Sequence, residues 1–232
     1  MSIWTKIYNT TLKIFGDIKV YKFPFFLLYD PGSYLIKGNE VREIMNTLKA
    51  GDILIRGYKN YLDGYFIPGF FSHAALYLGS VPNENNITLL PSVRDEFYAE
   101  GEQIVVHAMA EGVFMEDLLN FCRCDYIVIL RSSKVKQEDI DQIYNNALMK
   151  LGTPYDFQFD FSRYNNLSCT EFVYLCMQDY MDEEGVRLRD RRAPFRLRPT
   201  LIPDDFIDSS LELVWQSSTI PKGVVEKLRK ES

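Results

Sequence analysis

The sequence predicts a single α+β domain with a helical N-terminal extension, and three observations support this class. Short apolar runs with the character of strands begin a few residues after turn signals, at 51–56, 72–79, 104–109 and 126–130. Apolar residues at helical spacing mark 39–49, 137–151 and a stretch from 169 to about 181. No internal repeat or linker divides the 232 residues, and 47% of them are hydrophobic, which is ample for one core.

Composition and charge narrow the function classes. The net charge is -6 and the isoelectric point is about 5.1, which argues against general nucleic-acid binding. The four cysteines do not resemble a disulfide framework in a chain of this length. Cys122 and Cys124 have the wrong spacing for a zinc ribbon, so we expect no metal and no cofactor. A reducing compartment fits these cysteines best, and we expect a cytoplasmic protein.

We expect no secretion signal at the N-terminal part, because residues 1–16 lack a continuous apolar core and a small-residue cleavage site. The apolar run at 23–29 is far shorter than the roughly 20 residues that span a bilayer. We expect residues 1–47 to pack on the body of the protein. The alternative is that one of these segments contacts lipid or an acyl chain, which would make the protein membrane-associated at its periphery.

A cysteine occupies the predicted start of a buried helix. Ser168 suits the N-cap and Glu171 completes a capping box, while Leu167 and Phe172 can form a hydrophobic staple. Cys169 is then the first helical residue, where the helix dipole favours thiolate over thiol. We therefore expect alkylation of Cys169 at a pH below that typical of a free cysteine. The alternative is a small apolar residue that fills the helix start.

The chain has only two histidines, and both fall inside apolar strands. Strand alternation places His73 on one face with Ala75 and Tyr77, and His107 on one face with Val105 and Met109. A lone buried histidine is more often a satisfied core residue than a catalyst. Two histidines on strands that can pair, together with the cysteine at a helix start, favour chemistry.

Other segments leave alternatives open. The aromatic loop at 57–71 either binds an apolar substrate at a cleft or covers the core. Residues 80–101 read as a polar loop. The arginine-rich segment 185–198 reads as a solvated loop or as a contact for an anionic head group or carboxylate. We expect a short helix that opens at Pro203, an edge strand at 211–215 and a charged tail that frays from Pro221.

Several motifs share their order and spacing with a known family, and they span roughly residues 48–216: Gly51-Asp52-Ile53-Leu54, Ser72-His73-Ala74-Ala75-Leu76-Tyr77-Leu78-Gly79, Val105-Val106-His107-Ala108 with Gly112-Val113, Gly152-Thr153-Pro154-Tyr155-Asp156-Phe157, Ser168-Cys169-Thr170-Glu171-Phe172-Val173 and Pro203-Asp204-Asp205-Phe206. Together they resemble the circularly permuted branch of the NlpC-type papain-like cysteine hydrolases, especially the bacterial YiiX-like and YaeF-like proteins. Lecithin retinol acyltransferase is a more distant relative. The resemblance implies an antiparallel sheet or half-barrel packed against the helix that carries the cysteine. We expect this catalytic domain at 48–220, after the extension at 1–47 and before a charged tail at 221–232.

The resemblance also implies roles. Cys169 is the nucleophile, His73 the general base and His107 the third, orienting residue, with Glu111 as the fallback. Tyr155 matches a tyrosine near the active site and would help hold the oxyanion. The implied reaction is hydrolysis of an amide bond in a peptide or lipid-linked amide through a thioester. The alternatives are a lipid acyltransferase or thiol lipase, and a lipid-binding module without turnover. The substrate is thus a small molecule, a peptide or a lipid-like compound, and the oligomeric state stays open.

Overall fold

The computed structural model describes residues 7, 18–22, 25–29, 34–59, 68–80, 101–193 and 196–230. The middle of the predicted aromatic loop and nearly all of the polar loop predicted at 80–101 lie outside these ranges, as does the amphipathic segment at 1–16 apart from Ile7.

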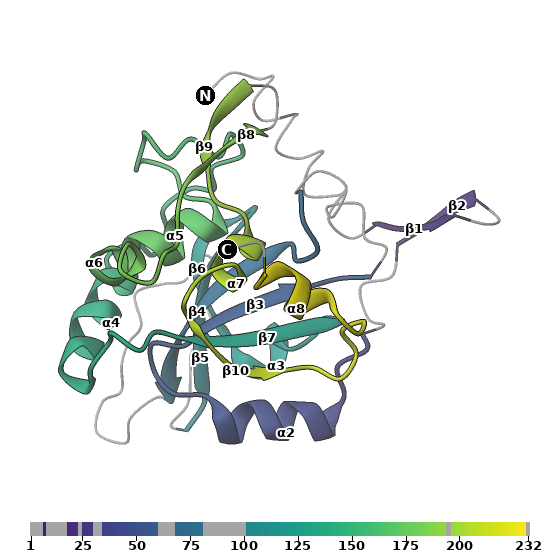
Figure 1. Cartoon of the computed structure of the whole chain (residues 1–232), viewed down its shortest axis with the longest axis horizontal. Coiled ribbons are helices and arrows are strands. Elements are labelled where there is room, and N and C mark those ends of the chain that lie inside the picture. Colours follow the sequence, from purple (N-terminus) through teal and green to yellow (C-terminus); the bar gives the residue numbers. More distant parts are fainter. Residues whose placement is uncertain are drawn as a thin grey trace.

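A six-stranded antiparallel sheet forms the centre of the molecule (Figure 1). Its spatial order is β10-β7-β3-β4-β5-β6. The strands are β3 (Ile53–Gly57), β4 (His73–Ser80), β5 (Gln103–Met109), β6 (Gly112–Asp117), β7 (Tyr126–Arg131) and β10 (Glu212–Gln216). The predicted antiparallel sheet is confirmed, and β10 lies at its edge as expected.

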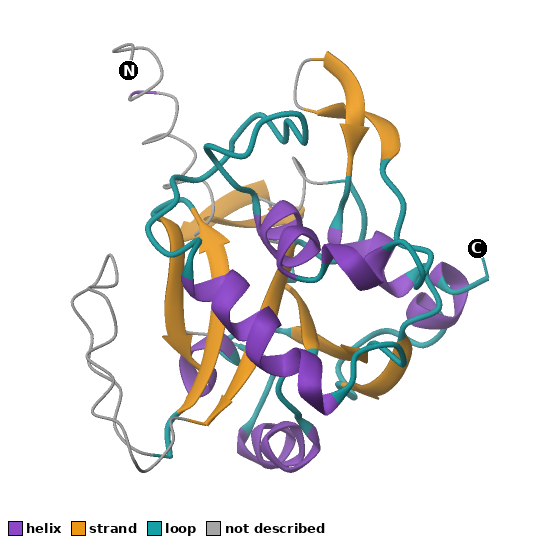
Figure 2. Ribbon diagram, turned by 90° about the vertical axis from the view of Figure 1, so that its left-hand side faces the viewer, coloured by secondary structure: helices purple, strands orange, loops and turns teal. Residues whose placement is uncertain are grey.

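Helices cover both faces of this sheet (Figure 2). Helix α5 packs on β4 and β5, and α4 packs on α5, while α3 contacts β5 and β6 and α2 contacts β10. The bounds are α2 (Gly38–Thr47), α3 (Leu118–Phe121), the 3-10 helix η2 (Gln137–Asp139), α4 (Ile140–Leu148), α5 (Cys169–Cys176), α6 (Gln178–Met181), α7 (Pro203–Ile207) and α8 (Val224–Leu228). None of the helices in the described ranges is both long and apolar enough to cross a membrane.

Strand alternation divides the buried residues into two cores. Ala74, Leu76 and Val106 face helix α5 and pack with its Phe172 and Val173. The opposite face carries a second cluster that includes Leu54, Ala75, Val105, Ile44 of α2 and Leu118 of α3. Because neighbouring residues of one strand point to opposite faces, the side chain of His73 belongs with the second face.

The Gly112-Val113 and Gly152-Thr153 motifs lie where two segments of the chain contact each other. The Val113 N–H donates to the Thr153 carbonyl at 2.8 Å, and the Gly152 N–H donates to the Val113 carbonyl at 2.8 Å. A Cβ on Gly112 would lie 2.5 Å from the Thr153 oxygen, and the φ of Gly112 is +109°. Glycine is therefore required where β6 meets the turn after α4.

Four secondary-structure predictions need correction. Residues 18–29, predicted as part of a helical extension, contain the hairpin β1 (Ile18–Lys22) and β2 (Phe25–Tyr29). The helix predicted from Cys169 to about Met181 is interrupted at Met177, between α5 and α6. The tail from Pro221 contains α8, whose Val225 is 1% exposed, so it does not simply fray. Apolar anchoring thus overrides the charged composition of the tail.

The arginine-rich segment is the fourth correction, since it forms the hairpin β8 (Arg189–Ala193) and β9 (Arg196–Thr200) and is not an irregular loop. Arg191 holds Asp205 of α7 through two bonds of 2.6 and 2.8 Å. Arg189 pairs with Asp208, and Arg198 lies 3.4 Å from Asp160. These charges are neutralised within the chain, which weakens the expectation of an anionic head-group site.

Candidate active site

Cys169 begins helix α5, as the sequence predicts. Ser168 is the N-cap, and its hydroxyl accepts from the Glu171 N–H at 3.4 Å. The Glu171 carboxylate accepts from the Ser168 N–H at 2.6 Å, which completes the capping box. Leu167 and Phe172 belong to the same buried cluster. The cap therefore fixes the position of the thiol by local hydrogen bonds and packing together.

The thiol lies against the start of β4. The ladder between β4 and β5 ends at the pair Leu76–Val106, three residues after the start of β4. The backbone N–H of Ala74 instead donates to the sulfur of Cys169, as does the N–H of Thr170. The sulfur atom of Cys169 is thus held beside the residue that directly follows His73 in the chain.

His73 and His107 meet on neighbouring strands. The Nε2 atom of His73 lies 2.7 Å from the Nδ1 atom of His107, and both rings are buried. The predicted pairing of the two histidine strands is therefore confirmed. The structure records no hydrogen bond between Cys169 and His73, which both lie in its described part. Nε2 of His73 thus faces His107, and Nδ1 is the other nitrogen of its ring.

Two further charged residues share this face, and the sequence reasoning did not identify them. Strand register places Arg56 of β3 directly opposite His73, and Glu116 of β6 one diagonal step from His107. Opposite residues of antiparallel strands point to the same face, so the four side chains form a row across β3, β4, β5 and β6. The Oε2 atom of Glu116 lies 3.3 Å from Nε2 of His107. A charged residue inside an apolar strand was the available signal in each case.

Burial controls the protonation of this group. It lowers the pKa of His73 well below its usual value, and the positive charge of Arg56 and the ring of His107 lower it further. Burial raises the pKa of the Cys169 thiol to about 11, although the N–H groups of Ala74 and Thr170 act in the opposite direction. The expectation of a thiolate favoured by the helix start is therefore wrong for this state. Thiol and imidazole are both neutral.

The other two predicted residues lie in different settings. Glu111 is exposed in the turn between β5 and β6, whereas the partner of His73 is His107. Tyr155 packs at the margin of the core, with its ring 4.8 Å from that of Phe157. The neighbouring Pro154 carbonyl accepts from the Leu167 N–H at 2.9 Å. Tyr155 is therefore tied through the backbone to the segment that enters the cysteine helix.

The Pro203-Asp204-Asp205-Phe206 motif supports the histidine strand. The Asp204 carboxylate accepts from the N–H groups of Phe70 and Phe71 at 2.7 and 2.9 Å. Phe71 is 1% exposed and covers the core, which is one of the two roles considered for the aromatic loop. Because these residues immediately precede β4, Asp204 fixes the path of the chain into His73.

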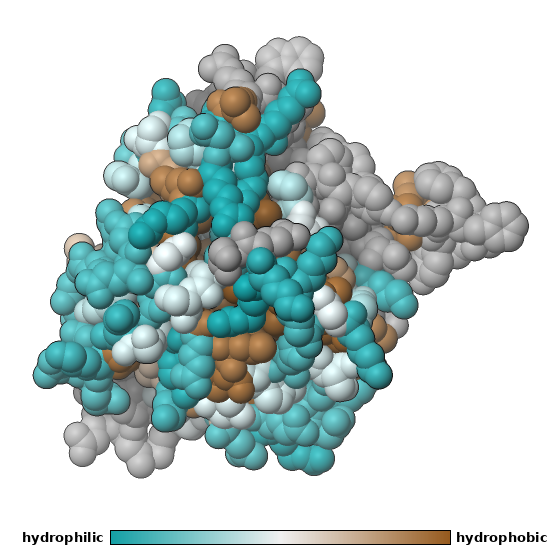
Figure 3. Space-filling model, viewed as in Figure 1, coloured by the Kyte–Doolittle hydropathy of each residue, from teal (hydrophilic) through white to brown (hydrophobic). Residues whose placement is uncertain are grey.

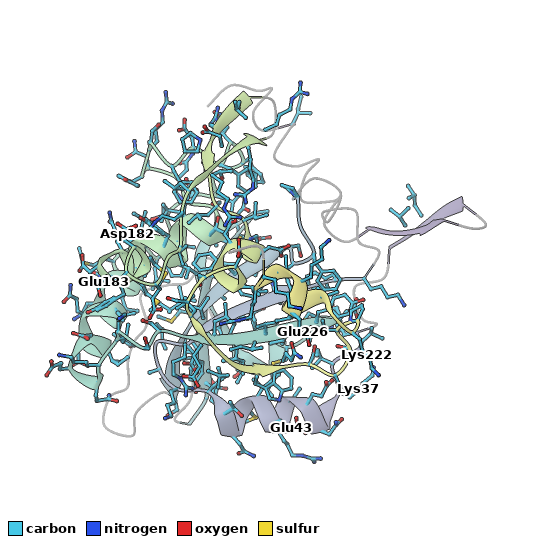
Figure 4. All side chains as sticks on the ribbon, viewed as in Figure 1. Lys37, Glu43, Asp182, Glu183, Lys222 and Glu226 are labelled. Carbon is cyan, nitrogen blue, oxygen red and sulfur yellow. The ribbon has the colours of Figure 1, made fainter. Side chains whose placement is uncertain are left out.

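A cavity of about 540 Å³ lies away from this group, between α2, β10 and α8. Its lining includes Glu43, Trp215, Lys222 and Glu226, and none of the predicted site residues. Figure 4 shows Glu43 on α2 and Lys222 and Glu226 near α8. Figure 3 shows apolar side chains gathered around β10 in an otherwise mainly hydrophilic face.

A comparison with solved structures found a similar fold. The chain matches the crystal structure of YiiX from Escherichia coli O157:H7, described as a metalloprotein, with a TM-score of 0.54 and 15% identity. The match covers 74% of this chain and 98% of that one. At this identity the likeness concerns the fold. No curated protein matches the sequence.

The histidine pair does not fit a shared metal ion. In the described ranges, no group of three or more His, Cys, Asp or Glu side chains is arranged to hold one. The two ring nitrogens are 2.7 Å apart, which is a hydrogen-bond separation. Two nitrogens bound to one tetrahedral zinc ion at about 2.0–2.1 Å each would be roughly 3.3 Å apart.

A family model matches the chain over residues 47–209, which include the cysteine helix, both histidine strands and the Asp204 motif. This range contains Arg56, His73, His107, Glu116 and Cys169, and the resemblance drawn from the motifs is confirmed. Members of the family are enzymes of the cysteine peptidase and amidase class. The chain belongs to the permuted papain-like amidase family YaeF/YiiX, C92.

Proposed function

We propose that this protein hydrolyses amide bonds with Cys169 as nucleophile, His73 as general base and His107 as the residue that orients the base. The observation that carries the proposal is the 2.7 Å contact between His73 and His107 beside the capped cysteine helix. A base whose second nitrogen is held by a third residue is the arrangement of catalytic triads in general.

Before the reaction Cys169 carries its proton as a thiol, so the proton is removed while the sulfur attacks the substrate carbonyl. With a thiol pKa of about 11, only about one Cys169 in 10⁴ is a thiolate at pH 7. His73 is neutral and therefore able to accept the proton through Nδ1. The sulfur then bonds to the carbonyl carbon, and the helix-start N–H groups with the Tyr155 hydroxyl stabilise the oxyanion. His73 passes the proton to the leaving amine as the C–N bond breaks.

The second half of the reaction uses the same base. Water enters, His73 removes one of its protons, and the hydroxide adds to the thioester carbon. The C–S bond breaks, the acid is released and the proton returns to sulfur. An alcohol or amine in place of water would give acyl transfer, so the two reactions differ in the acceptor and not in the residues used.

The surface near the cysteine helix favours a substrate whose acyl group is apolar. Leu197 on β9 is 72% exposed and Leu188, just before β8, is 40% exposed. This hairpin continues into Leu201, whose carbonyl accepts from the Thr170 hydroxyl at 3.0 Å in the first turn of the cysteine helix. Exposed leucines tied to the helix start suit an acyl chain better than a polar peptide, which favours a lipid-linked amide.

The test uses fluorogenic amides that share one amine and differ in the acyl part, either long-chain fatty acyl or peptidyl. We expect release of the amine by the wild type, faster with the fatty acyl series, and none by Cys169→Ala. Cys176→Ala, on the same helix and also buried, is the matched control and should retain activity. Mass spectrometry should find the acyl group on Cys169 during turnover.

The alternatives predict different results. An acyltransferase releases amine only when an acyl acceptor is added and yields the transferred product. A binding module retains the fatty acyl amide in both the wild type and Cys169→Ala, without release. Amine release that survives in Cys169→Ala would refute the proposed nucleophile.

A further inference from the structure

A buried carboxylate lies behind the histidine pair. Glu116 is 8% exposed, and its Oε2 atom is 3.3 Å from Nε2 of His107. The same oxygen is 3.8 Å from Nη1 of Arg56. A buried carboxylate must find a hydrogen-bond donor or a positive charge, so its position between these two groups needs a physical reason.

Arg56 is held mainly by other groups. Its Nη1 donates to the Phe121 carbonyl at 3.0 Å, and its Nη2 lies 3.3 Å from the Met109 sulfur. Its guanidinium carbon also stacks 4.3 Å from the Phe121 ring centroid. Glu116 is thus nearer to His107, at 3.3 Å, than to Arg56, at 3.8 Å. The positive charge of Arg56 compensates the Glu116 carboxylate from this longer distance.

This geometry determines where the protons of the two rings lie. At 3.3 Å the contact is electrostatic, and a lone pair on the facing His107 nitrogen would be repelled by the negative carboxylate, so that nitrogen carries the proton. A neutral ring has one protonated nitrogen, and Nδ1 of His107 is then an acceptor. Nε2 of His73 must be protonated to donate to it, which leaves Nδ1 of His73 with a free lone pair.

We infer that Glu116 is a positioning residue that sets the tautomers of both histidines, so that Nδ1 of His73 is the basic nitrogen. The inference rests on the proposed function for its kinetic consequence but not for the tautomers themselves. Without the carboxylate, Nδ1 of His107 can become the donor, and the proton of His73 then lies on Nδ1. In that tautomer the nitrogen required to accept the thiol proton is already occupied.

The first experiment measures ring ¹⁵N chemical shifts of the full chain labelled at histidine, without substrate. We expect Nε2–H on both rings in the wild type and Nδ1–H on His73 in Glu116→Leu. Because that variant leaves Arg56 without its carboxylate, a second variant combines Glu116→Leu with Arg56→Met, which removes both charges and keeps an apolar side chain on Phe121. Wild-type tautomers in a folded double variant would overturn the inference.

The second experiment measures turnover of the amide substrates. We expect kcat to fall about 10- to 100-fold in the double variant with KM nearly unchanged, as for other carboxylates that orient a functional histidine. Glu116→Asp should recover part of kcat. Asp117→Asn changes the next residue of β6, whose carboxylate caps α3 by accepting from the Leu119 N–H, and should leave kcat unchanged.

The two experiments distinguish a failure of the proposed function from a failure of the positioning role of Glu116. If no amide is cleaved but the tautomers change as expected, the proposed function is wrong and the positioning role stands. If the amides are cleaved and neither the tautomers nor kcat respond to the loss of Glu116, the positioning role is wrong and the proposed function stands.

Discussion

Replacing Glu171 by glutamine should remove a pH-dependent cost of folding at the start of the cysteine helix. Glu171 is 1% exposed, and burial raises its pKa to about 7, although the Ser168 hydrogen bonds partly oppose the shift. Glutamine keeps the oxygen that accepts from the Ser168 N–H, so the cap survives while the ionisable group is lost.

The sign follows from linkage. A carboxyl whose pKa is higher in the folded state than its ordinary 4.5 binds its proton more tightly when folded. Its contribution is fully present below pH 4.5 and is lost as the pH rises through 7. One pKa unit corresponds to 1.36 kcal/mol, so the loss is about 3 kcal/mol between pH 4.5 and 8. The unfolding free energy of Glu171→Gln minus that of the wild type should therefore be about 3 kcal/mol larger at pH 8 than at pH 4.5.

Urea unfolding at pH 4.5, 6 and 8 checks this, with the difference between variant and wild type as the quantity compared. Glu184→Gln is the matched control, because Glu184 is also buried but has its pKa lowered. Burial acts to raise that pKa, and bonds from Ser132, Ser210 and the Ser133 and Lys134 N–H groups outweigh it. Its replacement should reduce stability more at pH 8 than at pH 4.5. The same pH trend in both variants would refute the reasoning.

One labelling experiment and three substitutions test separate features. Iodoacetamide should label Cys169 with a rate that keeps rising up to about pH 11, and a plateau below pH 8 would contradict the raised thiol pKa. Gly112→Ala should lower the unfolding free energy by at least about 2 kcal/mol, because of strain and a backbone clash. Gly152→Ala has positive φ but open space and should cost about 1 kcal/mol in the same urea titration. Asp52→Asn should cost about 1–3 kcal/mol by weakening the two bonds from Arg131 at 2.6 and 2.7 Å, and equal stability to the wild type would contradict that role.

Local patterns in the sequence predicted most of the sheet and the cysteine helix. Runs such as 126–130 are apolar throughout and need no partner to be recognised, and the capping box at Ser168 is a property of adjacent residues. Strand β6 was missed although it contributes four buried apolar or small residues at 112–115, because it follows β5 after a two-residue turn. The hairpin of β8 and β9 was missed because its arginines are matched by carboxylates on α7, which are distant in the sequence.

The candidate site was predictable only in part. The cysteine, the two histidines and their pairing follow from local pattern and resemblance. Arg56 and Glu116 do not, because nothing near either residue in the sequence indicates its partner. Their proximity arises from the strand order β3-β4-β5-β6 and from two registers, Arg56 opposite His73 and Val105 opposite Glu116. A change of one residue in either register would turn one of them to the other face.

The protonation of Cys169 shows why the expectation that a helix N-terminus favours a thiolate was wrong here. A helix N-terminus favours a negative charge by typically 0.3–1 kcal/mol, which lowers a thiol pKa by less than about one unit. The pKa of Cys169 nevertheless rises from 9 to about 11, a net change of about 3 kcal/mol in the other direction, even with N–H groups from Ala74 and Thr170 on the sulfur. Burial of the thiol therefore outweighs the helix start. A nucleophile in this state depends on its base, and the base depends on the tautomer that His107 allows.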